Sequence, residues 1–524
     1  MNRRPAAGPG VDLPAQSLAG LLGGDDATRL FPGGPDGPVD SRDTAGTRRQ
    51  RLAVRPRRGG PGRFGGRSPV LLRDSAHRAS TAQAAGIYPF LHGAPLPPVG
   101  PHIGRDMHTG AAFSCHPVEW LHREIVSNTN LMVSGVPGSG KSALLKALAF
   151  RLMCFGIRTF IAGDLKNEYA PLARALGVDP LELGPGLANR LNPLDSGPLG
   201  RCLPADRDGA RQALDLITQR RISLLVSLLE MRLRRPVQTS EELALSLALR
   251  ELTGEASAAT RLVDPTLPEL HALLRDPSAG MVTQMRVRGF TTAGTGDTAA
   301  REAATQELRE LIRPVTDALA TLLTGALAGI FDGPTRAHLD FDGPLQTVDL
   351  SRIQARGDDD SIAMTLSCVS SWAQAAIDVT GGPPRLVIRD EVWRQARVPA
   401  MLRKVDADLR LSRSTGTIQV LATHQLGDFN GVGAAGSAER ALATELISKC
   451  AVRVLCPQDT GPLRELRETI GLSTAECDEI ARWTGPGFRG WGLWQIDRGG
   501  SHVVKVELTD LERQLFHTNE RMTV

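Results

Sequence analysis

The sequence predicts an α/β protein with a mainly parallel sheet, an all-α insertion and a disordered N-terminal tail. Three observations lead to this class. Short apolar runs of strand length alternate with helical stretches, as they do in parallel sheets. Residues 201–330 are rich in Leu, Ala, Arg and Glu with helical periodicity, and contain no strand-like run. Residues 1–85 lack regularly spaced apolar positions altogether.

The N-terminal tail, residues 1–85, is rich in Gly, Pro, Ser and Arg. It cannot bury enough apolar surface to offset its conformational entropy, so we expect it to be disordered. It holds fourteen arginines against seven acidic residues, whereas the whole chain has a net charge of only +4. Such a tail can bind nucleic acid or anionic lipid, but a general preference for Arg over Lys throughout the chain is the simpler explanation.

Several classes are disfavoured by composition. The seven cysteines form no CxxC pair, which argues against a disulfide framework and a zinc site and favours a reducing cytosol. No uncharged apolar run is long enough to cross a membrane, so any membrane contact is expected to go through partners. The N-terminus has no apolar core of the kind that a secretory signal requires.

The predicted elements follow in order from residue 86. Residues 104–106 and 112–113 form a short strand pair, and a first core strand at 131–134 leads through a Gly-rich turn into a helix. The other core strands are expected at 159–162, 346–350, 386–388, 418–422 and 452–455. An antiparallel pair, 490–496 and 502–508, is expected to close the sheet edge.

The strongest functional signal is the turn between the first core strand and its helix, which satisfies G-x-x-x-x-G-K-S/T. Successive backbone amides and the helix N-terminus can bind phosphate oxygens, and the glycines allow that backbone course. Lys141 is expected to neutralise the β- and γ-phosphates, and the Ser142 hydroxyl to bind magnesium. The sequence thus predicts a site for ATP and Mg²⁺ formed by Gly135, Val136, Pro137, Gly138, Ser139, Gly140, Lys141 and Ser142.

A second signal is the pair of carboxylates that ends the strand at 385–389. Side chains alternate along a strand, so Asp390 and Glu391 point to different places. Asp390 is predicted to hold magnesium through water, and Glu391 to polarise the attacking water as general base. We expect both to approach the phosphates from a neighbouring strand. Arg389 departs from the apolar residue normal at this position, and either faces the cleft or is a local variation.

Polar residues near the strand at 418–422 are further candidates. Gln425 is placed to sense the γ-phosphate or orient water, the alternative being that its amide caps the following turn. Arg410 and Arg413 share a helix face and can reach the γ-phosphate of a neighbouring subunit in a ring, the alternative being exposed arginines without a role. His424 is interpreted as structural, because Glu391 is available as the base.

Several stretches together resemble the VirB-type (TraC/TraE-like) conjugation ATPases, within the HerA/FtsK group of P-loop motors. Their order and spacing matter more than any one of them, and the resemblance covers about residues 95–520. Besides the phosphate loop, the stretches are residues 103–106, 163–169, 191–195, 331–333, 390–393 and 422–425.

The resemblance implies a RecA-like ATPase domain in two parts, residues 86–200 and 331–524, on either side of an all-α insertion at 201–330. It also implies ATP hydrolysis, assembly into a hexamer, and docking onto membrane-embedded secretion channel proteins at the cytoplasmic face of the membrane. The large N-terminal domain usual in these ATPases is not recognisable here, which leaves docking through that domain open.

Two other functions stay open at this stage. A DNA-pumping translocase or coupling protein would share the motor, although no base-reading module or aromatic stacking platform is visible, so DNA remains an open partner. A nucleotide-gated scaffold would bind ATP and oligomerise with little turnover. The complete set of Lys141, Ser142, Asp390 and Glu391 argues against a scaffold.

Overall fold

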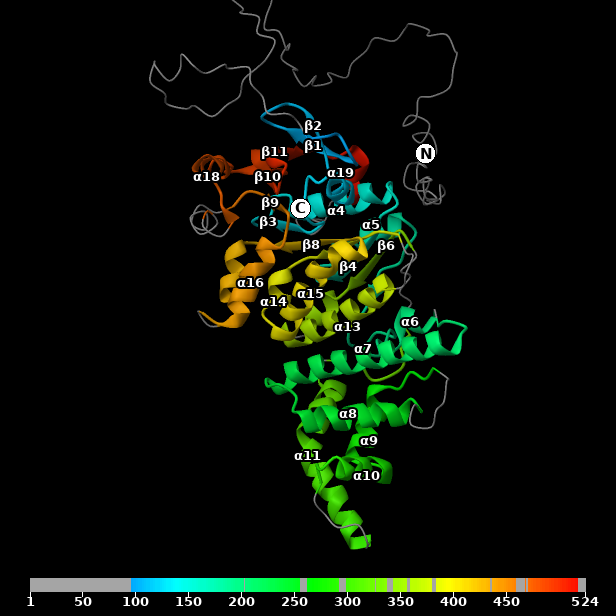
Figure 1. Ribbon diagram of the computed structural model, residues 1–524. Coiled ribbons are helices and arrows are strands. Elements are labelled where there is room, and N and C mark those ends of the chain that lie inside the picture. The colour runs from blue at the N-terminus through cyan, green and yellow to red at the C-terminus, as the bar shows by residue number, and fades with distance from the viewer. Residues whose placement is uncertain are drawn as a thin grey trace, which may run out of the picture.

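A computed structural model describes residues 96–516, except residues 202, 255–261, 292–297, 326, 337–342, 356–358, 379–382, 434–435, 459–466 and 468–469. The predicted tail, residues 1–85, lies outside the described residues. Within these limits the chain forms one sheet with helices on both faces, and a helical insertion extends away from it (Figure 1).

The centre of the sheet is parallel, as predicted. Almost all residues of its strands are buried, as expected where helices cover both faces; Arg158, Glu182 and Arg453 are half-buried. In spatial order they are β9 (Val452–Leu455), β3 (Leu131–Ser134), β8 (Thr417–Thr423), β7 (Arg385–Arg389), β4 (Arg158–Asp164), β6 (Leu345–Asp349) and β5 (Leu181–Glu182).

The other side of the sheet is antiparallel. β10 (Trp491–Ile496) pairs with β9 and with β11 (Gly500–Val506), which confirms the predicted last pair. The prediction that this pair closes the sheet is wrong, because β1 (His102–Asp106) pairs with β11 and β2 (Ala112–Ser114) lies outside β1. Gly104 permits this pairing: a Cβ there would lie 2.0 Å from the Lys505 carbonyl oxygen. The unpaired side of β11 is thereby covered.

Alternate residues of each strand pack on opposite faces. Leu386 and Ile388 of β7 belong to the same apolar cluster as the helices of one face, and Val387 to the cluster on the other. One face carries α3 (Pro117–His122), α4 (Lys141–Met153), α5 (Ala170–Ala175) and α19 (Asp510–Phe516). The other carries α13 (Asp359–Asp378), α14 (Val392–Ala396), α15 (Pro399–Thr415), α16 (Ala438–Ser448) and α18 (Thr474–Ala481). Short elements are α12 (Ser351–Gln354), η3 (Leu426–Gly431) and η4 (Pro486–Phe488).

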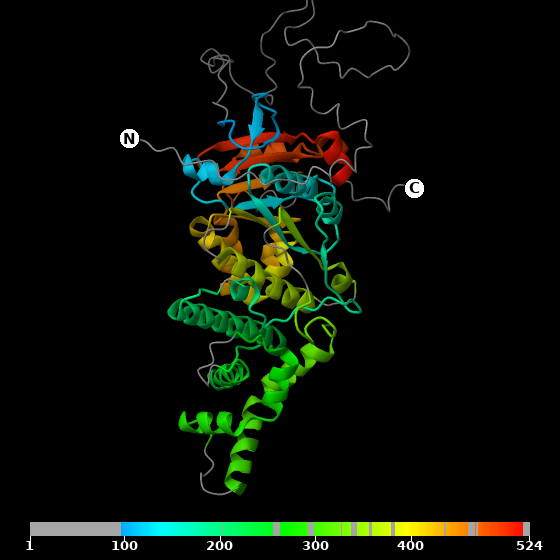
Figure 2. The same cartoon turned by 90° about the vertical axis from the view of Figure 1, so that its right-hand side faces the viewer.

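The predicted all-α insertion is confirmed. It projects from the α13 side of the sheet, as both views show (Figures 1 and 2). Side-chain caps begin several of its helices: Asp206 accepts a hydrogen bond from the Gly209 amide, and Thr266 and Glu269 form a capping box. Its helices are α6 (Gly197–Arg201), α7 (Arg207–Leu233), α8 (Thr239–Leu252), α9 (Leu267–Arg275), α10 (Ala279–Val287) and α11 (Thr298–Thr324).

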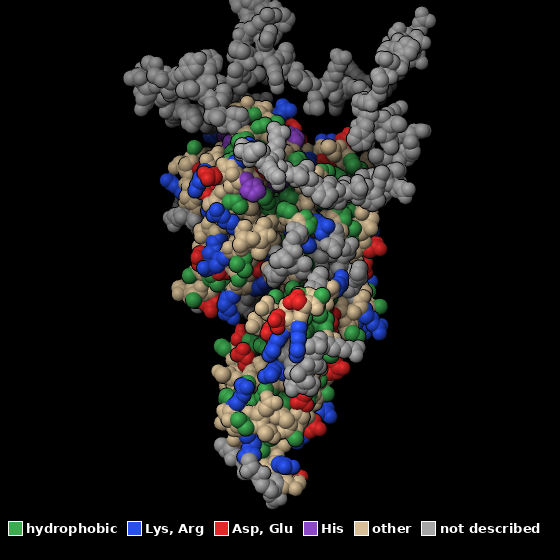
Figure 3. All heavy atoms as spheres, turned by 45° about the vertical axis from the view of Figure 1, so that its right-hand side comes forward, with side chains coloured by type: hydrophobic (Ala, Val, Ile, Leu, Met, Phe, Trp, Pro, Cys, Tyr) green, Lys and Arg blue, Asp and Glu red, His purple; other side chains and the backbone are tan. Residues whose placement is uncertain are grey.

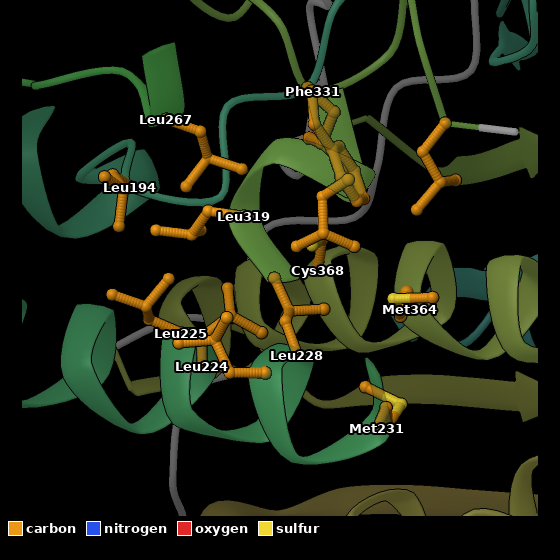
Figure 4. Packing of buried hydrophobic residues seen from close by; sticks show 14 of the residues in the cluster. Leu194, Leu224, Leu225, Leu228, Met231, Leu267, Leu319, Phe331, Met364 and Cys368 are labelled. Atoms are coloured by element: carbon orange, nitrogen blue, oxygen red, sulfur yellow. The ribbon is translucent and has the colours of Figure 1, made fainter. Parts of the chain in front are cut away.

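The insertion shares its apolar core with the layer beneath the sheet. Leu225 and Leu228 of α7 and Leu319 of α11 lie in one cluster with Cys368 of α13 (Figure 4). Burying such side chains stabilises the contact by about 1.5–3 kcal/mol each. We infer that the insertion is held firmly against α13. No helix among the described residues has the length and apolar character needed to cross a bilayer.

Candidate nucleotide site

The phosphate loop connects β3 to α4 with the backbone course that its glycines predict. Gly138 and Gly140 have φ of 82° and 102°, values that favour glycine. Gly140 directly precedes α4, which begins at Lys141, so the first free amides of the helix open beside the loop. Lys141 itself is largely buried, 6% exposed.

A cavity of about 900 Å³ lies over this loop. Its volume falls in the range of small-molecule and cofactor sites. It is lined by residues 136–138 and 140–142 of the loop, by polar residues from the ends of other strands, and by residues of the C-terminal region. The charged lining residues are Lys141, Lys166, Glu168, Asp390, Glu391, Arg489, Lys505, Glu507 and Arg513.

Asp390 and Glu391 line the same cavity as Lys141 and Ser142. The expectation that they come from a strand neighbouring the phosphate-loop strand is wrong, because β8 lies between β3 and β7. They still meet the loop because the parallel strands end at the same edge of the sheet. Four of the residues predicted for magnesium and catalysis, Lys141, Ser142, Asp390 and Glu391, therefore line one cavity although β8 separates their strands.

Glu391 is held in a left-handed backbone conformation, with φ 54° and ψ 41°. Such a conformation is rare for a residue with a side chain and is found most often at functional sites. Glu391 Oε1 lies 2.9 Å from both Lys166 Nζ and His424 Nε2, and Oε2 accepts a 2.7 Å hydrogen bond from Trp393 Nε1. Burial opposes ionisation, but the donors Lys166 and Trp393 outweigh it and lower the Glu391 pKa.

Asp390 is in a different environment from Glu391. Burial raises its pKa, although the charge of Lys141 works in the opposite direction. Its Oδ1 accepts a 3.0 Å hydrogen bond from the Glu391 amide. A nearby cation stabilises the ionised form of such a desolvated carboxylate strongly. The environment of Asp390 therefore fits a position beside magnesium.

His424 is closer to the site than the sequence suggests. Its Nδ1 lies 3.4 Å from Lys141 Nζ, while its Nε2 contacts Glu391, so one ring joins the loop lysine to the carboxylate. The interpretation of His424 as purely structural missed this contact. Its place at the end of β8, one residue beyond the strand, was the signal that could have indicated it.

Gln425 lies next to His424 but has a different task in this structure. Its side chain forms a capping box with Asp428 at the start of η3. The backbone N–H of Gln425 donates a 2.9 Å hydrogen bond to Asp428 Oδ2. The cavity lining includes His424 and, among the described residues, not Gln425. This is the geometry of the cap, and a role for Gln425 at the γ-phosphate stays a prediction.

The turn after β4 brings further charges to the cavity. Asp164 accepts hydrogen bonds from the amides of Lys166, Glu168 and Tyr169, which fix the turn so that Lys166 faces Glu391. Burial raises the Asp164 pKa to about 6 in spite of these amides. The sequence segment 163–169 carried the family resemblance, and the structure places it against the predicted base.

Arg389 does not face the cleft. It has the same parity along β7 as Val387, so it points to the face covered by α13, α14 and α15. There it contacts Asp408 Oδ2 at 2.5 Å and Ser370 Oγ at 3.0 Å, and both charged partners are 3% exposed. Of the two alternatives left open for Arg389, the local variation holds.

Arg410 and Arg413 lie at the opposite end of the sheet. They occupy the last turns of α15, before β8 begins, and the seven residues of β8 separate them from His424 by about 20 Å. Arg410 pairs with Asp406 at 2.8 Å, and Arg413 is exposed. Neither can act on the phosphate loop of its own chain.

Comparisons with known proteins agree with this architecture. No protein-family model matches the sequence, and no curated protein is significantly similar. The structure of VirB4 of Thermoanaerobacter pseudethanolicus superposes with a TM-score of 0.60 at 20% identity, covering 80% of this chain and 100% of VirB4. The chain has the fold of VirB4. The fold that the sequence motifs predicted is thereby confirmed.

A more distant likeness is found to the coupling protein TrwB. Its unbound form, a bacterial conjugative coupling protein, aligns with a TM-score of 0.46 at 13% identity, over 78% of this chain and 89% of TrwB. The complex of TrwB with ADP and Mg²⁺ aligns with a TM-score of 0.43 at 14% identity, over 74% of this chain and 87% of TrwB.

Proposed function

We propose that the protein is an ATP-hydrolysing motor of a conjugative or type IV secretion apparatus. The observation that carries the enzymatic part is the convergence of Lys141, Ser142, Asp390 and Glu391 on one cavity. A phosphate loop alone would serve a scaffold equally well. A loop that meets a carboxylate beside its lysine and a second carboxylate held by three donors has the parts required for hydrolysis.

The residues present fit a magnesium triphosphate. The amides from Gly138 to Ser142 and the positive end of α4 would hold the phosphates, with Lys141 as their fixed counter-charge. The Ser142 hydroxyl and the Asp390 carboxylate supply oxygens, which are the ligands that magnesium prefers. When bound, the ion would neutralise charge on the β- and γ-phosphates.

Glu391 is the proposed general base. Its lowered pKa keeps it ionised, but both of its oxygens already accept hydrogen bonds in this conformation. Oε1 contacts both Lys166 and His424, whereas Oε2 accepts only from Trp393 Nε1 among the described residues, so Oε2 keeps a lone pair that can accept from the attacking water. We infer that His424, in contact with both Lys141 and Glu391, transmits the arrival of phosphate charge at the lysine to the base.

The assignment to a secretion apparatus rests on the VirB4 fold together with the motifs of conjugation ATPases at residues 163–169, 191–195 and 422–425. By analogy with that family we propose a hexamer at the cytoplasmic face of the membrane, docked onto embedded channel proteins. Among the described residues on the face shown in Figure 3, acidic and basic side chains are interspersed.

Turnover by wild-type protein and by Glu391→Gln tests the proposal. A general base contributes about 10²- to 10⁴-fold, so Glu391→Gln should lose that much activity while still binding MgATP. Lys141→Ala should lose nucleotide binding as well. Equal, negligible turnover in wild type and Glu391→Gln would instead indicate a scaffold, and DNA-stimulated turnover with a steep salt dependence would indicate a DNA translocase.

A further inference from the structure

The turn before β10 is docked directly on the phosphate loop, although the two segments are some 350 residues apart in the chain. The Gly490 amide donates a 2.8 Å hydrogen bond to the Ser139 carbonyl. A Cβ on Gly140 would lie 2.8 Å from the Gly490 nitrogen, so only glycine allows this approach. The contact is therefore one of backbone against backbone.

The turn is anchored from both sides. On one side Phe488 packs against Trp491 with ring centroids 5.2 Å apart, and Trp483 lies 6.2 Å from Trp491. On the other side the Val506 amide of β11 donates to the Gly490 carbonyl at 2.8 Å. A residue in this turn is thus held in a fixed place relative to the phosphate loop.

Arg489 is that residue. Its Nε donates a 3.0 Å hydrogen bond to the Gly138 carbonyl, and its side chain lines the cavity with Lys141 and Ser142. Among the described residues no carboxylate pairs with Arg489, and its two terminal nitrogens contact no acceptor. A guanidinium has five donors in a planar fork that suits phosphate oxygens, and only one of them is used here.

We propose that Arg489 binds a β- or γ-phosphate oxygen of the nucleotide, in the same subunit as the loop on which it rests. The Gly138 contact orients the fork, and the terminal nitrogens supply the ligand contact. The inference rests on the proposed function, because it assumes that the cavity holds a nucleotide triphosphate. It gives the site an arginine of its own, independent of any arginine from a neighbouring subunit.

The alternative role for Arg489 is a purely structural one, in which it merely fixes the loop through Gly138. Two substitutions separate these roles. Arg489→Lys keeps the positive charge, whereas Arg489→Gln keeps a donor for the Gly138 carbonyl without the charge. Arg482→Ala is the matched control, since Arg482 is an exposed arginine at the end of α18 that pairs with Glu479 at 3.8 Å, in the same segment.

The test is isothermal titration of the full chain with Mg²⁺ and a non-hydrolysable ATP analogue. We expect Arg489→Ala to weaken binding about tenfold to a hundredfold, the usual effect of losing a charge-assisted hydrogen bond. Arg489→Lys should recover part of the loss, Arg489→Gln should not, and Arg482→Ala should bind like wild type. A thermal melt of each variant checks that it is folded.

Two results would overturn the inference: unchanged affinity in Arg489→Ala, or equal recovery by the Gln and Lys variants, which would assign Arg489 to loop structure. Lys141→Ala makes these results distinct from a failure of the proposed function. If wild type binds and Lys141→Ala does not, the nucleotide site stands whatever Arg489 does. If wild type itself does not bind, the proposed function fails, and the role of Arg489 fails with it.

Discussion

The two ends of the parallel strands use charged residues in opposite ways. At the carboxyl ends, Lys141, Asp390 and Glu391 line one cavity of about 900 Å³ and leave room for a ligand between them. At the amino ends, Arg410 and Lys449 pair with Asp406 on the surface formed by α15 and α16. The residues at the carboxyl ends thus place several charges around one cavity. The residues at the amino ends neutralise one another in direct ion pairs.

This difference in how the charges are paired distinguishes a ligand site from a stabilised surface. The Arg410 side chain is 59% exposed, so water and salt screen its pair with Asp406, although Asp406 itself is largely buried. The carboxyl end instead keeps buried carboxylates with raised pKa values, Asp164 and Asp390, at a cost to stability. Such a cost is typical of functional sites. We therefore place the proposed chemistry at the carboxyl ends of the strands, and a role for the amino ends would require another subunit.

The largest effect is expected for that intersubunit role. If Arg410 or Arg413 completes a neighbour's site, Arg413→Ala or Arg410→Ala should lower turnover by about 10³-fold or more. Activity per chain should rise with protein concentration. Arg403→Ala is the matched control, because Arg403 lies on the same helix and its side chain is 59% exposed, like that of Arg410.

A mixing experiment sharpens this prediction. Glu391→Gln and Arg413→Ala subunits, each inactive alone, should regain part of the activity when combined, because some interfaces then carry one intact residue of each kind. Flat activity per chain across the concentration series, with no recovery on mixing, would remove both arginines from the mechanism.

The next largest effect is expected for the buried ion pair between Arg389, at the end of β7, and Asp408 of α15. Arg389 directly precedes Asp390, and its partner Asp408 lies on α15 two residues before Arg410. Removing one partner leaves a buried charge, so Arg389→Met or Asp408→Leu should destabilise the fold by about 3–5 kcal/mol. Arg389→Met combined with Asp408→Leu should be less destabilised than either single variant.

Urea unfolding with a double-mutant cycle measures the Arg389–Asp408 coupling. Lys404, which contacts Asp408 at 2.8 Å, provides a comparison: Lys404→Met removes a partly exposed partner and should cost about 1 kcal/mol or less. Strictly additive effects of Arg389 and Asp408 would show that the pair does not act as a unit.

The smallest effect is a pH dependence at Asp164. Its folded pKa of about 6 lies above the value near 3.9 expected in the unfolded chain. The folded state then binds the extra proton, so stability contributed at this residue falls as pH rises from about 4 to 6. Between pH 5 and 7 wild type should lose about 1 kcal/mol relative to Asp164→Asn. An identical difference at both pH values would contradict the raised pKa.

Sequence reasoning found what is contiguous in the chain. Two such features are the phosphate loop from Gly135 to Ser142 and the strand followed by Asp390. Both can be recognised in the sequence, because each is a single run of residues with its own local geometry. The helical insertion is likewise visible in periodicity alone. Strand order is different: nothing in the sequence places β8 between β3 and β7, or β1 beside β11. These choices depend on crossovers and packing over the whole sheet.

Individual site residues were missed for the same reason. His424 and Gln425 are adjacent at the end of β8, and which of them faces the cavity depends on the backbone turn into η3. Arg489 lies far from the loop in sequence, and only the antiparallel pairing of β10 with β9 brings it to Gly138. Local sequence patterns can predict candidate site residues, whereas tertiary contacts determine where their side chains point.

The most direct measurement of the account is a crystal structure of Glu391→Gln with MgATP. We predict the triphosphate along the amides from Gly138 to Ser142, with magnesium beside the Ser142 hydroxyl and Asp390, and residue 391 facing the γ-phosphate. A nucleotide bound elsewhere, or an ion remote from Asp390, would contradict the central claim that the carboxyl end of this sheet is an ATPase site.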